Sequence, residues 1–334
     1  MRLTDIRAIS TVLHDGRPAV GVRIKTEKAE AWSEVLTNKA AELAEVVNQN
    51  AAKFLGLQIV KLDDLWQLEK VLPRGPALVA AQSAALGTWS AERQRPLWKI
   101  LNPNSKQINE VFVNVGRTED ITEILLRANQ NLSGTATLAK ASALDLSGLS
   151  AFDAIRRVEK TLGAAGHSIG IDLEAHRMMR SGKYFWRNFN GHSLNVDAKK
   201  HAEMVSELVH HFDIKYIEDP LHKNAFYELA SLHKKLVRYG HRHVCGDHLV
   251  RGDLARARIA KKHGSVNALL IDLEKSGSIL SAKKLFDFCK SNNLTPVMRI
   301  NNAVTANLAL AWQAPIAKAT MSGFNELNKL GKDF

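Results

Sequence analysis

The sequence predicts an α/β protein in which a (β/α) barrel of the TIM type follows an α+β N-terminal domain. From about residue 168 onward, short apolar runs alternate with helical patterns, at the roughly 25–30-residue spacing of successive βα units in a parallel sheet. Before about residue 108, the pattern is instead a hairpin followed by helices. We therefore expect a capping domain over residues 1–108 and a barrel over residues 109–334.

The N-terminal domain is predicted to begin with two strands and to continue with helices. Residues 1–25 alternate as strand, turn and strand, with Asp15-Gly16 as the hairpin turn. Residues 28–55 carry alanine, glutamate and leucine at helical spacing, and Gly56 stops the pattern. An alanine-rich segment over residues 77–94 predicts a second helix.

The barrel prediction depends on several strand and helix segments in strict alternation. The expected strands are SIGIDLEA, IKYIEDP, HVCGD, ALLID and PVMRIN, and the expected helices between or after them include KHAEMVSELVHHF, AFYELASLHKKLVRYG, LARARIAKKHG, SAKKLFDFCKSNN and AVTANLALAWQ. No glycine-rich GxGxxG turn follows any of these strands, which favours a closed barrel over an open nucleotide-binding sheet.

The composition is that of a soluble globular protein. Hydrophobic residues make up 45% and charged residues 24% of the 334 residues, and no apolar run approaches the about 18 residues of a membrane span. The opening MRLTDIRAIS lacks the apolar stretch of a secretory signal. Two cysteines far apart, in no CxxC pattern, argue against a disulfide framework, and we expect a cytoplasmic protein.

The net charge of +12 leaves two interpretations open. A basic balance suits an anionic partner such as nucleic acid or a phosphorylated metabolite, but it is equally compatible with a general effect on solubility. The lysines and arginines are spread widely, and no aromatic RNA-binding signature accompanies them. The sequence therefore gives only weak support for a nucleic-acid partner.

Four acidic residues directly follow apolar runs and form the main candidate site: Asp172, Glu218, Asp247 and Asp272. The carboxyl ends of parallel strands meet at one end of a barrel, which is where barrels place their active sites. A single acid there is often only the N-cap of the next helix, but four in succession favour a metal or catalytic cluster. Carboxylate oxygens select Mg²⁺ rather than zinc. His248 directly follows Asp247 and is a further candidate for lining this site.

Several stretches of the chain resemble the enolase family. The similarity is carried by SIGIDLEAHRMMRSGKYFW, KYIEDPLHKNAFYELASL, HVCGDHLVRGDLARARIAKKHGSVNALLIDLEKSGS and IAKATMSGFNELNKL, and the opening hairpin is also similar. The resemblance covers nearly the whole chain, which is shorter than typical members. It implies an enolase-like barrel with a capping domain, and a cytoplasmic glycolytic lyase that is commonly a dimer.

The resemblance also implies roles for individual residues. The three acids that hold the Mg²⁺ of the family fall on Asp172, Glu218 and Asp247, where the metal binds the substrate carboxylate and stabilises the enolate. The family's lysine that binds this carboxylate matches Lys318. The implied reaction is the dehydration of 2-phosphoglycerate, a small phosphorylated acid, to phosphoenolpyruvate.

Other positions depart from the family pattern. Asp272 stands where the family keeps its catalytic lysine, so that Asp272 and Lys318 are the catalytic candidates. The run that grips the substrate phosphate reads Arg-Ile-Asn-Asn here, from Arg299 onward. Arg299 is therefore a substrate-binding candidate, together with His248. The segment that carries the family's proton-donor glutamate has no counterpart, and LAKASALDLSGLSAF stands in that region.

Three functional hypotheses agree with this pattern of retained and altered positions. The first is Mg²⁺-dependent enolase-type dehydration. The second is a catalytically degenerate protein of the same fold, a pseudoenzyme that acts as a binding or moonlighting scaffold. The third is another enolase-superfamily reaction on a carboxylic acid, with Asp272 as the base or as a further metal ligand.

Overall fold

The computed structural model describes residues 1–13, 16–105, 108, 110–115, 135–140, 155–156, 159, 168–189, 192–238 and 240–331. The chain forms two compact units. The first unit comprises Met1–Gln107, Asp272–Phe286 and Asn302–Gln313, and the second comprises Ile108–Ile271, Asp287–Asn301 and Ala314–Phe334. No helix in the described ranges is long and apolar enough to cross a membrane.

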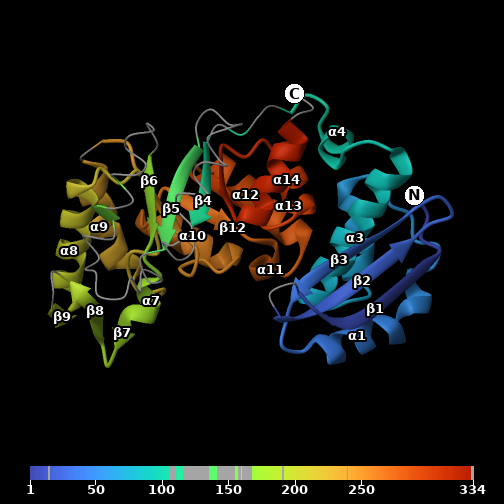
Figure 1. The fold of residues 1–334 in the computed structure, drawn as a ribbon, viewed down its shortest axis with the longest axis horizontal. Helices are drawn as coiled ribbons and strands as arrows, with labels where there is room; N and C mark the ends of the chain where they lie inside the picture. Colours follow the sequence, from blue (N-terminus) through green and yellow to red (C-terminus); the bar gives the residue numbers. More distant parts are fainter. Residues whose placement is uncertain are drawn as a thin grey trace. The chain divides into compact units, whose positions relative to one another are not determined.

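The first unit is built on an antiparallel sheet in the order β1-β2-β3. The predicted hairpin is present as β1 (Asp5–Val12) and β2 (Pro18–Lys25), with Asp5 opposite Lys25 and Val12 opposite Pro18. Asp15, in the predicted turn, lies outside the described residues. Helices α1 (Ala40–Gln49) and α3 (Pro76–Arg93) pack against the sheet (Figure 1). The shorter helices of this unit are η1 (Ala51–Phe54), η2 (Leu62–Leu65), α2 (Trp66–Glu69) and α4 (Leu97–Leu101).

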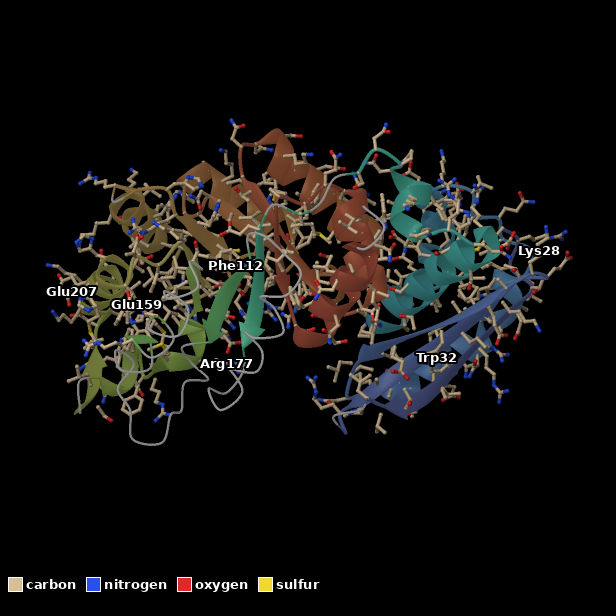
Figure 2. The ribbon with its side chains drawn as sticks, turned by 45° about the horizontal axis from the view of Figure 1, so that its top comes forward. Lys28, Trp32, Phe112, Glu159, Arg177 and Glu207 are labelled. Atoms are coloured by element: carbon tan, nitrogen blue, oxygen red, sulfur yellow. The ribbon has the colours of Figure 1, made fainter. Side chains whose placement is uncertain are left out.

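The helix predicted over residues 28–55 is wrong in its first part. Glu30–Leu36 forms strand β3, which pairs with β2, and the helix α1 begins only at Ala40. The helix propensity of alanine and glutamate is overridden because β3 completes the sheet and places Trp32 across Gly21. A β-carbon at Gly21 would clash with the indole ring, so this close approach requires glycine. Figure 2 labels Trp32 on this sheet.

The helix predicted over residues 77–94 is confirmed as α3, which is buried on most sides. It packs against later segments that belong to the same unit: α11 (Leu273–Ser276), α12 (Ile279–Ser291, as far as Phe286) and α13 (Ala303–Ala311). The fully buried Gln82 accepts a hydrogen bond from the backbone N–H of Ile279 at 2.7 Å, and the N–H of Gly75 donates to the Gly277 carbonyl at 2.9 Å. These bonds connect segments about 200 residues apart in the sequence.

The second unit contains a closed, all-parallel barrel of eight strands, which confirms the predicted fold class. Around the barrel the strands are β4 (Glu110–Val115), β5 (Thr135–Lys140), β6 (Ile169–Asp172), β10 (Tyr216–Glu218), β11 (His243–Gly246), β12 (Ala268–Ile271), β13 (Thr295–Ile300) and β14 (Ile316–Ala319). Its helices include α8 (Ala198–His211), α9 (Phe226–Val237), α10 (Leu254–His263) and α14 (Met321–Gly331).

The barrel interior is filled by alternate residues of its strands. A buried apolar cluster joins Phe112, Tyr216, Cys245, Ala268, Leu270, Val297 and Ile316. Phe112 and Tyr216 are in ring contact at 4.7 Å between centroids, and Figure 2 shows Phe112 among the strands. Because successive side chains alternate between the two faces of a strand, residues two positions further along point to the same interior. Glu218 on β10 and Lys318 on β14 occupy such positions, at the carboxyl end.

A small antiparallel sheet, which the sequence did not predict, comes after β6. It consists of β7 (Met179–Arg180), β8 (Lys183–Phe189) and β9 (His192–Val196), after the short helix α7 (Ala175–Met178). Its side chains enclose His201 of α8, which is fully buried. The indole N–H of Trp186 donates to His201 Nδ1 at 2.9 Å, and His201 Nε2 lies 2.8 Å from the Pro220 carbonyl. Both contacts fit a neutral imidazole that is protonated on Nε2.

Burial lowers the pKa of His201 to about 4, and this predicts acid lability. As the pH falls below about 6.5, the unfolded chain binds a proton at His201, whereas the folded chain binds it only near pH 4. The free energy of unfolding therefore decreases between about pH 6.5 and 4. At pH 5 this residue should lower the free energy of unfolding by about 2 kcal/mol relative to pH 7.5. Urea denaturation at both pH values checks this for the wild type, His201→Gln and a control, His211→Gln, on the exposed side of α8. Equal pH dependence in the wild type and His201→Gln would contradict it.

Candidate active site at the carboxyl end of the barrel

The predicted acids lie at the carboxyl ends of neighbouring strands. Asp172 ends β6, Glu218 ends β10 and pairs with Asp172 in register, and Asp247 directly follows β11. Their side chains are almost fully buried, with exposed fractions of 2%, 0% and 4%. This arrangement results from the alternation of apolar strand and helix, because parallel strands all end at the same rim.

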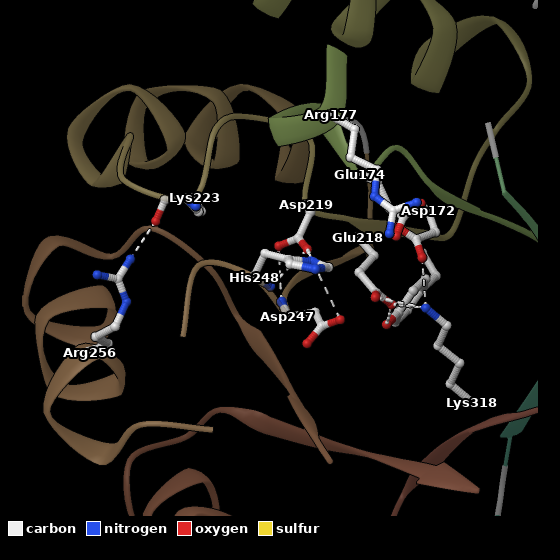
Figure 3. A network of polar contacts seen from close by, with 11 residues as sticks. Asp172, Glu174, Arg177, Glu218, Asp219, Lys223, Asp247, His248, Arg256 and Lys318 are labelled. Atoms are coloured by element: carbon white, nitrogen blue, oxygen red, sulfur yellow. Dashed lines mark hydrogen bonds and ion pairs between the residues drawn. The ribbon is translucent and has the colours of Figure 1, made fainter. Parts of the chain in front are cut away.

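Lys318 reaches two of these acids from the other side of the barrel (Figure 3). Its Nζ atom lies 2.9 Å from Asp172 Oδ2, 2.7 Å from Glu218 Oε1 and 2.8 Å from Glu218 Oε2, and the side chain is 4% exposed. Burial alone would lower the pKa of this lysine, but the carboxylates of Glu218 and Asp172 outweigh that effect and raise it. Lys318 is therefore an ammonium ion at neutral pH.

Glu218 accepts hydrogen bonds from two side chains in an electrostatically crowded position. The hydroxyl of Tyr216 donates to Glu218 Oε2 at 2.7 Å, the same oxygen that lies 2.8 Å from Lys318 Nζ. Burial, followed by the charge of Asp172, raises the pKa of Glu218 above its ordinary value although Lys318 lowers it. The Lys318 ammonium thus does not offset the effect of burial and of the neighbouring carboxylates on Glu218.

A fourth carboxylate, Asp219, was missing from the sequence prediction. In an extended strand it would face away from its neighbour Glu218, but its backbone has a positive φ of 44° directly before Pro220. Its carboxylate accepts the backbone N–H groups of Asp247 at 3.0 Å and His248 at 2.8 Å. The acid pair in the IEDP stretch was the only signal in the sequence that could have indicated it.

The oxygen donors of this rim fit a divalent cation. Glu218, Asp219 and Asp247 each offer a carboxylate oxygen, and these oxygens lie within 4.8 Å of one another. Buried carboxylates in excess over the neighbouring ammonium are the donor set that a hard cation such as Mg²⁺ prefers. Asp172 stands apart from this trio, because its Oδ2 is held by Lys318 and its Oδ1 accepts the Glu174 N–H at 3.2 Å. A cation that used both Asp172 and Glu218 would have to displace the ammonium between them.

His248 lies beside the carboxylate trio, in the turn after β11. Its Nδ1 atom is 2.7 Å from Asp219 Oδ2 and 3.6 Å from Asp247 Oδ2, and its side chain is 22% exposed. The imidazole of His176 lies against it, with 3.9 Å between the ring centroids and a tilt of 31° between the rings. Burial and the neighbouring His248 lower the pKa of His176 to about 4, so that this ring is neutral at physiological pH.

Asp272 directly follows β12 and caps the next helix. Its carboxylate accepts the backbone N–H groups of Glu274 at 2.9 Å and Lys275 at 3.3 Å, at the start of α11. This is the N-cap alternative that the sequence left open for strand-end acids. Asp272 belongs to the first compact unit, whereas the three other predicted acids belong to the second. A catalytic role for Asp272 stays a prediction.

The Arg-Ile-Asn-Asn run divides between the barrel interior and a helix start. The register pairs Arg299 with Lys318, so both side chains lie on the interior face of their strands, and Arg299 Nε donates to Asn301 Oδ1 at 3.4 Å. Asn302 caps α13 and accepts the N–H of Thr305 at 3.0 Å. The LAKASALDLSGLSAF region lies outside the described residues from position 141 onward.

Comparisons with known proteins agree with this architecture. A family model described as "Enolase C-terminal domain-like" matches residues 132–329. The chain is 28% identical to the enolase of Archaeoglobus fulgidus over 188 residues, which are 54% of this chain and 44% of that protein. It is 23% identical to the enolase of Pyrobaculum aerophilum over 236 residues, 66% of this chain and 55% of that protein. The matches thus span about half the length of these relatives.

Proposed function

Because this chain belongs to the enolase C-terminal domain-like family, we propose that its barrel rim binds a divalent cation, Mg²⁺ by its donor set, and acts on a small carboxylic acid. The leading candidate reaction is the dehydration of 2-phosphoglycerate to phosphoenolpyruvate. The observation that carries the proposal is the buried cluster in which the Lys318 ammonium meets Asp172 and Glu218, next to the carboxylates of Asp219 and Asp247.

The acidic residues of the cluster and its lysine have different roles. Glu218, Asp219 and Asp247 supply the oxygens that hold a cation, and Asp172 completes the negative lining on the Lys318 side. A bound divalent cation would stabilise the negative charge that develops on a substrate carboxylate when the neighbouring carbon loses its proton. Lys318, charged and already placed between two carboxylates, is suited to donate to the carboxylate of a substrate.

Purified protein with saturating Mg²⁺ and 2-phosphoglycerate should form phosphoenolpyruvate, which is followed by its absorbance. Asp172→Ala should abolish this turnover, because it removes one carboxylate partner of Lys318 from the cluster. Glu207→Gln, an exposed change on α8, serves as the control and should retain the activity. Absence of turnover at high protein concentration, with metal binding intact, would rule out the leading reaction.

A second candidate is a reaction of the same superfamily on an acid without a phosphate. It is favoured by Asn302, which caps α13 at a position that corresponds to the phosphate-binding run of the family. Exchange of the α-hydrogen of hydroxy acids in deuterated water, followed by proton NMR, distinguishes the two candidates. Exchange without phosphoenolpyruvate formation supports this reaction. If neither is seen, the degenerate scaffold is favoured.

A further inference from the structure

Two imidazoles and one carboxylate form a second cluster at the same rim: His176, Asp219 and His248. Each offers one ligand atom, and these three atoms lie within 4.8 Å of one another. The cluster shares Asp219 with the oxygen trio, but its other two members are nitrogen donors. Nitrogen donors suit a different class of cation from the one that the oxygens select.

Backbone hydrogen bonds hold the three contributing segments together. The N–H of Ala175, next to His176, donates to the Asp219 carbonyl at 3.1 Å. The N–H of Asp219 donates to the Cys245 carbonyl at 3.0 Å, and the His248 N–H donates to Asp219 Oδ2. The cluster is therefore positioned by the ends of β6, β10 and β11 and not by mobile side chains alone.

One imidazole nitrogen of His176 lacks a partner among the described residues. His176 Nδ1 is buried, and no hydrogen bond to it is formed within the described part of the chain. A buried polar atom without a partner is costly, and a coordinated cation would satisfy it. His248 Nδ1, by contrast, lies within hydrogen-bond distance of Asp219 Oδ2 at 2.7 Å, and a cation bound to both atoms would replace this contact.

We propose that His176, Asp219 and His248 bind a borderline transition-metal cation of the Zn²⁺ class, distinct from the Mg²⁺ expected at the carboxylates. Two histidines and one carboxylate are a common ligand set for catalytic zinc and for non-haem iron, with positions left open for water or substrate. Both imidazoles are partly exposed, so a cation can reach the site from solvent.

Cobalt substitution tests this site by spectroscopy, independently of any activity. Metal-stripped protein is titrated with Co²⁺ while the visible d–d absorption is recorded, and Zn²⁺ is titrated in parallel by calorimetry. We expect one tight site in the wild type. His176→Gln and His248→Gln should each weaken it by at least about 10-fold, since loss of even an outer-shell partner has that effect. His210→Gln, an exposed change on α8, is the matched control and should bind as the wild type does.

The two cation sites are separated by a crossed comparison. Glu218→Gln should weaken Mg²⁺ binding and leave the Co²⁺ spectrum unchanged. His248→Gln should weaken Co²⁺ binding and leave Mg²⁺ binding unchanged. Equal Co²⁺ affinity in the wild type and in both histidine variants would overturn the proposal, as would an equal loss in His210→Gln, which would indicate binding to scattered surface histidines. If one histidine variant fails to fold, as judged by circular dichroism, the other still decides the result.

Discussion

Replacing Lys318 with methionine should lower the free energy of unfolding by about 3–5 kcal/mol in metal-free buffer. The substitution removes the ammonium that contacts both Asp172 and Glu218, and it leaves both carboxylates buried at 2% and 0% exposure. Breaking one side of a buried ion pair costs far more than the pair itself contributes, because the remaining charge has lost its solvent and its partner. Urea denaturation at pH 7.5 measures the loss.

Lys329→Met is the matched control for this experiment. Lys329 pairs with Glu326 one turn away on α14, but the lysine is 70% exposed, and such surface pairs contribute about 0–1 kcal/mol. Added Mg²⁺ should restore part of the stability lost in Lys318→Met, since a cation can take over the position of the ammonium. A loss below about 1 kcal/mol in Lys318→Met would show that the lysine does not neutralise the cluster.

Replacing Glu218 with glutamine should remove the stabilisation that Mg²⁺ gives to the folded protein. At a Mg²⁺ concentration 100 times the dissociation constant, the wild type should gain about 2.7 kcal/mol. Glutamine has nearly the size of glutamate, and its amide oxygen can still accept a hydrogen bond from the Tyr216 hydroxyl. It lacks the negative charge that attracts the cation. The substitution should therefore act on the Mg²⁺ effect more than on the metal-free stability.

The measurement is a pair of urea denaturation curves, with and without Mg²⁺, for the wild type and Glu218→Gln. Asp247→Asn should behave like Glu218→Gln because it belongs to the same oxygen trio. Glu207→Gln removes an exposed acid and should keep the full Mg²⁺ effect. A Glu218→Gln protein that retains the gain would place the cation elsewhere.

The barrel and the acids at its rim could be predicted because they depend on local periodicity. A short apolar run that ends in an acid predicts both the strand and the position of the acid at its carboxyl end, as ALLID does for β12. The contacts that each acid makes cannot be predicted in the same way. Asp272 looks like Asp172 in the sequence, and each accepts the backbone N–H two residues further on, but only the structure shows that the second oxygen of Asp172 meets the Lys318 ammonium.

The parts of the site that were missed depend on backbone conformation and on long-range contacts. Asp219 enters the site only because its positive φ reverses the alternation expected after Glu218. The pairing of Lys318 with Glu218 and Asp172 joins residues 100 and 146 positions apart, which no local pattern encodes. The residue similarity suggested Lys318, but only the folded chain shows which carboxylates it meets.

The strands that the sequence missed have a similar cause. Glu30–Leu36 contains good helix formers, but it forms strand β3 because it pairs with the edge of β2. The short sheet from β7 to β9 lies in a stretch of mixed aromatic and basic residues with no clear period. In both places tertiary pairing outweighs local propensity.

A crystal grown with Mn²⁺ in place of Mg²⁺ tests the central claim most directly, because anomalous scattering locates the ion. We predict a peak within coordination distance of the Glu218 and Asp247 carboxylates, with the Lys318 ammonium shifted away from Glu218 to accommodate it. The absence of any peak at these carboxylates at saturating Mn²⁺, with Lys318 still bound to Asp172 and Glu218, would contradict the account: the ammonium would then be a permanent substitute for the metal.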